Sequence, residues 1–269
     1  MFCILRYSQV GERLRFRGRL RPRSVPGQQP GGGPAEASDA DEELAGTLDN
    51  LDDAVNYADW IYSLMAPFLG ERVLEVGAGH GTLTDRLMPG RTVTATDVSP
   101  RCVSILEDRY RGSDRVNVLQ ADCDDAPRLG QFDSVVLVNV LEHIADDARA
   151  LRSIEKALEP GGHLVLYVPA FEELYSDFDR RIGHHRRYRT EQLRSLVTEV
   201  GLEVVDLRYV NMVGAVAWWA LATKLGRTPT QRWSAMTFDR LVVPVVSRLE
   251  RRQPPPFGQS ILCVARRRW

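Results

Sequence analysis

The feature that most constrains this chain is a glycine-rich bend directly after an apolar run. Residues 73–76 are typical of a buried strand, and Gly77, Gly79 and Gly81 follow them at alternating positions. Glycine accepts backbone conformations that other residues avoid, and it lets the backbone approach a ligand closely. A helix that starts after the bend would offer unpaired N–H groups to an anionic group. We therefore expect a strand, a tight turn and a helix that together bind a ligand.

The spacing of the glycines and one nearby carboxylate narrow the class of ligand. A dinucleotide-binding turn has the pattern G-x-G-x-x-G, but Thr82 stands where its third glycine would be. Glu75 lies in the strand, two residues before the bend, where a carboxylate would repel a pyrophosphate. The same carboxylate suits S-adenosylmethionine (SAM), which carries an ammonium and a sulfonium. The pattern E-x-G-x-G-x-G after an apolar strand resembles motif I of the class I SAM-dependent methyltransferases.

The rest of the chain alternates between predicted strands and helices. Strands are expected at residues 72–76, 92–96, 116–120, 134–138, 163–168 and 203–209. Helices are expected at residues 51–69, from the bend to 87, and at 101–110, 146–158 and 190–200. Apolar strands that alternate with helices favour a parallel sheet covered on both faces, with ligands at the carboxyl ends of its strands.

The resemblance implies an α/β, Rossmann-like fold with a seven-stranded, mostly parallel sheet in the order 3-2-1-4-5-7-6 and helices on both faces. Its last strand would be antiparallel, and residues 260–266 fit that strand. In the minimal fold strands six and seven form a near-hairpin, whereas residues 211–258 intervene here. This insertion contains two helical runs, 213–225 and 237–252, and we expect a helical cap or an element that forms a homo-oligomer.

Composition divides the chain and restricts its partners. Residues 1–45 combine scattered arginines, a Pro/Gly-rich stretch and an acidic run, so we expect a disordered tail before a single domain at 46–269. The net charge of −1 gives no overall field for nucleic acid or an anionic membrane. The four cysteines form no C-x-x-C pair, which fits a reducing, cytoplasmic compartment. No apolar run reaches the length of a membrane span, so stable insertion is not expected.

Acidic residues at the ends of successive strands predict how the cofactor is held. Asp97 comes twenty residues after Gly77, where an acid accepts the ribose hydroxyls, although a turn aspartate would also stand there. Asp122 would accept from the adenine amino group or cap the following turn. Residues 132–144 resemble motif IV of the family, which implies that the backbone around Asn139 holds the methionine part of SAM. The expected cofactor-binding residues are Glu75, Gly77, Ala78, Gly79, Gly81, Asp97, Val98, Asp122, Cys123, Asn139 and Val140.

His143 is the candidate catalytic residue. It follows the fourth strand, and an imidazole titrates near neutral pH, so it would deprotonate an acceptor hydroxyl. Helix capping and contact with SAM are the alternatives. Its neighbour Glu142 would join a metal site only with further ligands. Since no second acidic ligand is apparent nearby, no metal is expected.

One segment of the chain is a candidate for binding the acceptor. Residues 175–189 follow the fifth strand and bring two histidines, several arginines and two tyrosines together. They form either a lid for an anionic or phenolic group, or a surface loop in which Asp177 and Asp179 pair with arginines. The candidate substrate residues here are Tyr175, His184, His185, Arg187 and Tyr188.

Aromatic residues outside that segment leave similar alternatives. Tyr57 and Trp60 on the first helix would close over SAM or belong to the core. Trp218 and Trp219 in the insertion would line a substrate pocket, form an interface, touch a membrane surface or pack in the core.

The resemblance implies methyl transfer from SAM to a small-molecule acceptor. We favour O-methylation of a natural-product, quinone-like or lipid-linked acceptor. The alternative is a SAM-binding protein that does not methylate and acts as a regulator, scaffold or cyclase. A nucleic-acid substrate is not expected, because the sequence Asn139-Val140-Leu141-Glu142 replaces the Pro-Pro-Tyr type of motif found in base-amino methyltransferases.

Overall fold

The computed structural model describes residues 54–220 and 236–269. Seven strands form one sheet in the order β3-β2-β1-β4-β5-β7-β6, which confirms the predicted order. The strands are β1 (Arg72–Val76), β2 (Thr92–Asp97), β3 (Val116–Gln120), β4 (Phe132–Val138), β5 (Leu158–Pro169), β6 (Leu202–Val210) and β7 (Ser260–Arg267). β7 runs antiparallel to both β5 and β6, as expected, while the other neighbouring pairs are parallel.

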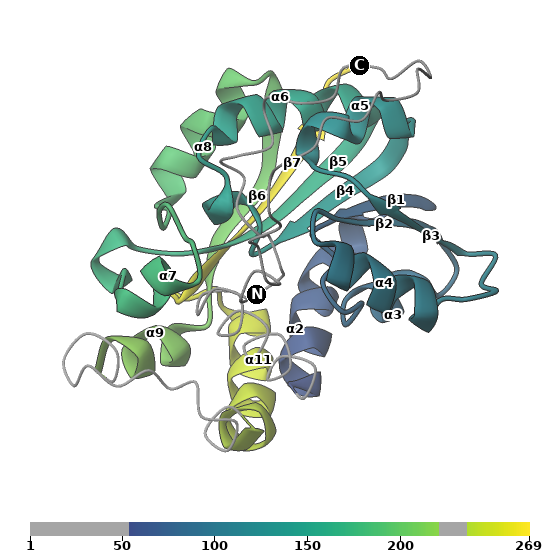
Figure 1. The fold of residues 1–269 in the computed structure, drawn as a ribbon. Coiled ribbons are helices and arrows are strands. Elements are labelled where there is room, and N and C mark those ends of the chain that lie inside the picture. The colour runs from purple at the N-terminus through teal and green to yellow at the C-terminus, as the bar shows by residue number, and fades with distance from the viewer. Residues whose placement is uncertain (1–53, 221–235) are drawn as a thin grey trace, which may run out of the picture.

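Helices cover both faces of the sheet (Figure 1). They are α2 (Val55–Met65), α3 (Thr84–Leu87), α4 (Pro100–Arg109), α5 (Ala126–Leu129), α6 (Asp147–Ala157), α7 (Asp177–Arg181), α8 (Thr190–Glu199), α9 (Met212–Trp218) and α11 (Val243–Arg252). Short turns of 3-10 helix lie at η1 (Ala66–Phe68), η2 (Cys123–Asp125), η3 (Leu141–His143) and η4 (Glu172–Leu174), and a π-helical turn, η6 (Phe238–Val242), leads into α11.

Alternation along the strands builds two apolar cores. Leu74 and Leu137 point to the face that packs against α6 and α8. Val73 and Val136 point to the opposite face, which packs against α2, α4 and α11. Because successive side chains of a strand point to opposite faces, a strand buried on both sides must be apolar throughout, as β4 and β5 largely are.

Several boundaries differ from the prediction for identifiable reasons. β5 begins at Leu158 rather than at 163, because Leu158 pairs with Phe132 across an irregularity in the register. α3 is a single turn that begins only at Thr84. The first insertion helix is described over Met212–Trp218, and the last part of the predicted run, residues 221–225, lies outside the described residues, as do the predicted tail 1–45 and residues 46–53.

Two further expectations concern the whole described region. Cys102, Cys123 and Cys263 are buried and form no disulfide within the described residues, and Cys3 lies outside them. Within residues 54–220 and 236–269, no helix has the length and apolar character needed to cross a membrane.

Candidate active site

The glycine bend connects β1 to α3 and lies against the ends of two neighbouring strands. Gly77, Gly79 and Gly81 have φ angles of 73°, 59° and 90°, in the left-handed region that favours glycine. A Cβ on Gly77 would lie 2.5 Å from Cγ2 of Val140, which directly follows β4 and Asn139. The bend therefore requires glycine both for its backbone angle and for the close approach of Val140.

Hydrogen bonds hold the start of the bend on β2. The N–H groups of Gly77 and Ala78 both donate to the carbonyl of Thr96, at 2.8 and 2.9 Å. The helix expected to follow directly is shorter than predicted, since α3 has only four residues. Four peptide units give little macrodipole, so any attraction of this helix start for an anionic group is weak, and it stays a prediction.

Glu75 lies beneath the bend with one oxygen unsatisfied. The Thr84 hydroxyl donates to its Oε2 at 2.5 Å, while the buried Oε1 has no hydrogen-bond partner in the described structure. Burial raises the pKa of Glu75 to about 8. Once ionised, this buried group has a spare acceptor that fits a ligand with a cationic or hydrogen-bond-donating group, such as the ammonium of SAM.

Asp97 ends β2 and lies beside the bend. Its Oδ2 accepts from the Gly79 N–H at 3.0 Å, and its Oδ1 accepts from the Ser99 N–H at 2.9 Å. Burial raises the pKa of Asp97 to about 8. Each oxygen keeps a second lone pair, so the ribose hydroxyls and the turn amides can share this carboxylate. Val98, next in the chain, packs against the core below β2.

Asp122 follows β3 and takes the capping role that was one of its two alternatives. Its Oδ1 accepts from the N–H groups of Asp124 and Asp125, at 2.8 and 3.2 Å. Burial raises the pKa of Asp122 above its usual value. Cys123 is buried in the same turn. Capping does not use every lone pair of the carboxylate, so contact with adenine remains a prediction.

Asn139 directly follows β4 and has an unusual conformation. Its φ is 51°, and its N–H donates to the Tyr167 carbonyl at 2.7 Å. A non-glycine residue in the left-handed region costs free energy, so such residues are found mainly where a site demands them. The registers Val76–Thr96 and Val76–Leu137 bring Gly77, Asp97 and Asn139 to the same edge of the sheet.

His143 lies in η3, one turn after Val140. The His143 N–H donates to the Val140 carbonyl at 3.0 Å, which links the imidazole to the glycine bend through a short stretch of backbone. The side chain is buried, and neither Nδ1 nor Nε2 has a hydrogen-bond partner in the described structure. Burial, with a smaller contribution from His184, lowers the pKa of His143 well below its usual value. The ring is therefore neutral at physiological pH, and burial also makes it a weaker base than a solvent-exposed imidazole.

Glu142, His143 and His184 form one buried polar cluster. One ligand atom from each lies within 4.8 Å of the others, and the rings of the two histidines meet edge to face at 4.6 Å. Both Glu142 oxygens and His184 Nε2 also lack hydrogen-bond partners in the described structure. Burial raises the pKa of Glu142 to about 8. Two imidazoles and a carboxylate are a donor set for a divalent transition metal, so His184 supplies the partner that Glu142 lacked in the sequence analysis.

His184 is oriented by a buried ion pair behind it. Its Nδ1 lies 2.8 Å from Oδ1 of Asp179, and the Arg187 guanidinium binds the same carboxylate through Nε and Nη2 at 2.9 and 3.1 Å. Although burial opposes ionisation, the bonds from His184 and Arg187 hold the pKa of Asp179 below its usual value. The guanidinium also lies over the Trp218 ring, 5.3 Å from its centroid.

The predicted acceptor lid is for the most part a structural element. Arg187 is bound by Asp179, and Tyr188 is buried with its hydroxyl donating to Asp147 at 3.0 Å, so neither is available as a mobile lid residue. Tyr175 donates to the His184 carbonyl at 2.7 Å and fixes the loop. His185 is exposed. Of the two interpretations of residues 175–189, the loop in which Asp177 and Asp179 pair with arginines therefore fits the structure better than the lid.

The aromatic residues of α2 and α9 also pack inward. Trp60 is buried in the core on the α2 face, which corrects its expected place in a lid, although its indole N–H has no partner in the described structure. Tyr57 is partly buried, and its hydroxyl lies 2.9 Å from that of Tyr167. Trp218 is buried and donates to the Leu174 carbonyl at 3.0 Å.

Three residues that help to build the site were not singled out from the sequence. Thr84 binds Glu75, Tyr167 receives the Asn139 N–H on its carbonyl, and Tyr110 donates to the Gly81 carbonyl at 3.0 Å. No local pattern marks a threonine or tyrosine for such a role, because each bond joins different elements.

Comparisons with known proteins agree with this geometry. The family model described as a methyltransferase domain matches residues 48–207. Ubiquinone biosynthesis O-methyltransferase of Ralstonia nicotianae is 29% identical over 168 residues, which are 56% of this chain and 70% of that protein. Demethylmenaquinone methyltransferase of Clavibacter sepedonicus is 34% identical over 104 residues, 38% of this chain and 42% of that protein. For three of the curated relatives the match spans only 27%, 42% and 47% of their length.

Solved structures share the fold at low identity. A chain in the complex between the Haloferax volcanii Trm112 methyltransferase activator and the putative methyltransferase is 20% identical, with a TM-score of 0.59 and coverage of 85% of this chain and 96% of that chain. A putative methyltransferase of Bacillus halodurans is 18% identical, with a TM-score of 0.54 and coverage of 78% and 99%. The [4+2]-cyclase SpnF is 22% identical, with a TM-score of 0.51 and coverage of 77% and 80%. Since one fold carries several reactions, these likenesses concern the fold alone.

Proposed function

Because the chain belongs to the class I SAM-dependent methyltransferases, with SAM as its cofactor, we propose that it methylates an oxygen atom of a small-molecule acceptor, with His143 as the base. The observation that carries this proposal is the placement of His143. Its backbone N–H binds the Val140 carbonyl beside the glycine bend, and within the part of the chain that the structure describes both of its ring nitrogens are without a hydrogen-bond partner.

The edge of the sheet provides groups for each part of the cofactor. SAM supplies an electrophilic methyl group on a sulfonium. We assign the ribose to Asp97 and the adenine amino group to Asp122. The bend at Gly77, Ala78, Gly79 and Gly81, together with Glu75 and the backbone of Asn139 and Val140, would hold the methionine part. Glu75 supports this assignment, since its buried Oε1 needs a donor.

The chain's own catalytic contribution is placement, exclusion of water and removal of one proton. A neutral imidazole accepts the hydroxyl proton through the lone pair of its unprotonated nitrogen. His184 lies edge-on to the same ring and is fixed by Asp179, so it limits the orientations open to His143. The buried surroundings of η3 exclude water from the proton transfer.

The names of relatives support the proposed methylation of an oxygen atom and the proposed class of acceptor. The names of the relatives from Ralstonia and Clavibacter give quinone-pathway substrates for those proteins. We propose a quinone-like, natural-product or lipid-linked acceptor for this chain. Of the candidate acceptor residues, Tyr57, Tyr175 and His185 keep this assignment, since none of the three is fully buried.

The test is release of S-adenosylhomocysteine from SAM, measured by mass spectrometry against a panel of catechols, quinols and amines. We expect turnover with hydroxyl acceptors. His143→Gln should lower kcat by about 10²- to 10⁴-fold, with little change in the dissociation constant for SAM. His163→Gln is the matched control, because His163 pairs with Ser134 near the amino end of β4, whereas the bend lies at the carboxyl ends of the strands.

Two outcomes would contradict the proposal. Bound SAM without turnover on any acceptor would favour a SAM-binding protein that does not methylate. Equal losses of turnover and SAM affinity in His143→Gln would make His143 a cofactor contact instead of a base.

A further inference from the structure

The C-terminal helix of the insertion exposes apolar side chains that its own fold does not bury. Leu241, Val245 and Leu249 are 69%, 54% and 62% exposed. Their spacing of four residues places them along one side of η6 and α11. The opposite side carries Val243 and Val246, which are buried against the core. Three large aliphatic residues in line are more than the scattered single exposures that a protein surface ordinarily has.

The exposed charged side chains of this helical segment are all of one sign. They are Arg240, Arg248, Arg251 and Arg252, of which Arg251 also donates to the Ser63 hydroxyl on α2 at 3.0 Å. Spacing places Arg248 and Arg252 each within a turn of Leu249.

The two acids of the segment are turned inward. Asp239 is buried and accepts from the N–H groups of Asn56 and Tyr57 at the start of α2, at 3.2 and 2.8 Å. Glu250 accepts from the N–H groups of Asn211 and Met212, at 2.8 and 2.9 Å. The exposed side of residues 238–252 therefore combines aliphatic side chains and guanidinium groups and presents no carboxylate.

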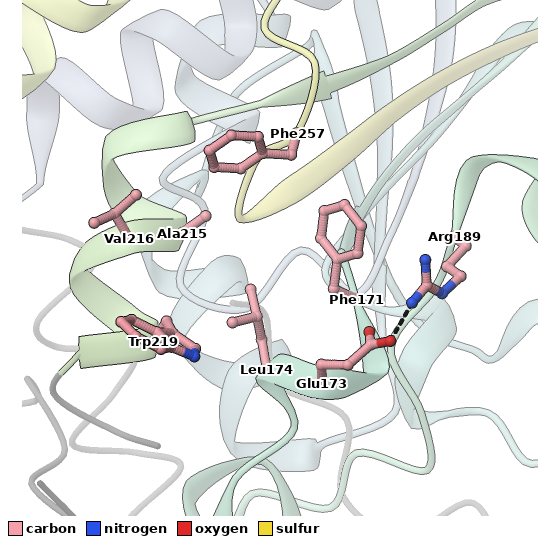
Figure 2. Close-up of a pocket in the computed structure, with 8 residues that line it drawn as sticks. All are labelled: Phe171, Glu173, Leu174, Arg189, Ala215, Val216, Trp219 and Phe257. Carbon is pink, nitrogen blue, oxygen red and sulfur yellow. Dashed lines mark hydrogen bonds and ion pairs between the residues drawn. The ribbon is translucent and has the colours of Figure 1, made fainter. Parts of the chain in front are cut away.

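The helix α9, whose start is hydrogen-bonded to Glu250 of α11, also exposes apolar side chains. α9 contains no charged residue, and Val213 and Val216 on it are exposed. Val216 and Trp219 also line a groove of about 440 Å³ with Phe171, Leu174 and Phe257. Figure 2 shows these apolar side chains around the groove, with the Glu173–Arg189 ion pair at one end. The size and lining of the groove suit a hydrocarbon chain.

We propose that the docking face, defined as Leu241, Val245 and Leu249 with Arg240, Arg248, Arg251 and Arg252, binds the surface of an anionic lipid bilayer. A helix with leucines and arginines on its exposed side lies in the headgroup region, with the aliphatic groups in the acyl boundary and the guanidinium groups on phosphates. This binding is peripheral and involves no membrane-spanning helix.

Charge decides between a bilayer and a second copy of this chain. In a two-fold dimer built on this face, each set of four arginines would face the same set on its partner. Such like-charge contacts are unfavourable and nothing on the face offsets them. An anionic bilayer instead supplies phosphate to every guanidinium and hydrocarbon to every aliphatic side chain.

Docking is independent of the proposed methylation, because the face shares no residue with the glycine bend or with His143. In Figure 1, α9 and α11 lie at the same end of the molecule as α2 and α7. A lipid-linked acceptor would then reach the enzyme from the bilayer, with its chain in the groove beside α9.

The test is co-sedimentation of the full chain with vesicles of phosphatidylcholine alone or with 30% phosphatidylglycerol. We expect the anionic vesicles to bind at least about tenfold more tightly, with a marked loss in high salt. Leu241→Ser with Val245→Ser and Leu249→Ser should weaken this binding by about tenfold or more, as should Arg248→Gln with Arg252→Gln. Val205→Ser is the matched control, since Val205 is 47% exposed on β6. Circular dichroism should show every variant folded, because all the altered side chains are exposed.

Three results would overturn the proposal. Unchanged binding in both multiple variants would place the lipid contact elsewhere, for example in the arginine-rich residues 1–45, which all variants retain. Equal binding to neutral and anionic vesicles would remove the role of the arginines. A dimer in light scattering that dissociates in the aliphatic variant would make a second copy the occupant.

Discussion

At the scale of single residues, the main finding is that three site carboxyls are buried with raised pKa values. Glu75, Asp97 and Glu142 each have a pKa of about 8, and burial is the largest cause in every case. The sequence indicated Glu75 and Asp97 because both end strands beside the glycine bend. It could not show their protonation, because that depends on how completely other elements cover them.

These carboxyls make stability depend on pH in a definite direction. Near neutral pH the native state keeps protons on them that the unfolded chain has lost, so unfolding releases protons and rising pH favours the unfolded state. We expect the free energy of unfolding, from urea titrations, to fall between pH 6.5 and 8.5. Each carboxyl contributes at most about 1.4 kcal/mol per pH unit. The pKa values of His143 and His184 are lowered, so their titration affects the free energy of unfolding only at pH values below this window.

Glu142→Gln isolates one of these groups. It keeps the shape of the side chain and removes its titration, so the fall in stability with pH should be shallower by up to about 1.4 kcal/mol per unit. A variant with the same pH dependence as the parent, or a parent whose stability rises over this window, would show that Glu142 is ionised in the native protein.

At the scale of elements, the strands were predicted well and the segment after β5 less well. A strand that is buried on both faces of a sheet is apolar throughout. Apolar runs such as residues 73–76 and 134–138 were therefore enough to predict where these strands lie. The segment 175–189 is polar and rich in arginine, which describes a solvated lid as well as a buried ion-pair network. Only the packing of Arg187 and Tyr188 against other elements decides between them, and such contacts leave no local pattern.

The central role of Asp179 in this segment leads to a prediction about stability. Asp179→Asn leaves the Arg187 guanidinium buried without its charge partner, and removing one partner of a buried pair costs about 3–5 kcal/mol. We expect the free energy of unfolding to fall by that amount. Asp177→Asn is the matched control, since Asp177 pairs with Arg180 at the surface and should change stability little.

The turnover of Asp179→Asn distinguishes a positioning role of Asp179 in the active site from a purely structural role. Because Asp179 orients His184 beside His143, kcat in Asp179→Asn should fall further than the loss of folded protein explains. Stability and turnover that match those of Asp177→Asn would contradict the network described here.

At the scale of the whole molecule, the sheet order followed from the family resemblance and not from periodicity. Alternating strands and helices predict a parallel sheet but leave the order of its strands open. Once the order is known, the meeting of Gly77, Asp97 and Asn139 follows, because the carboxyl ends of β1, β2 and β4 lie at one edge. The contact of Glu142 with His184 did not follow, because it depends on how the loop after β5 folds back over η3.

Calorimetric titration of the purified chain with SAM tests the central claim most directly, namely that this edge of the sheet binds SAM. We predict a single site per chain, weakened by about 1–3 kcal/mol in Asp97→Ala through loss of a charge-assisted hydrogen bond to the ribose. Asp122→Ala, which removes a cap and the proposed adenine contact, should weaken binding less. Absence of binding to the parent chain, or equal affinity in the parent and Asp97→Ala, would contradict the account.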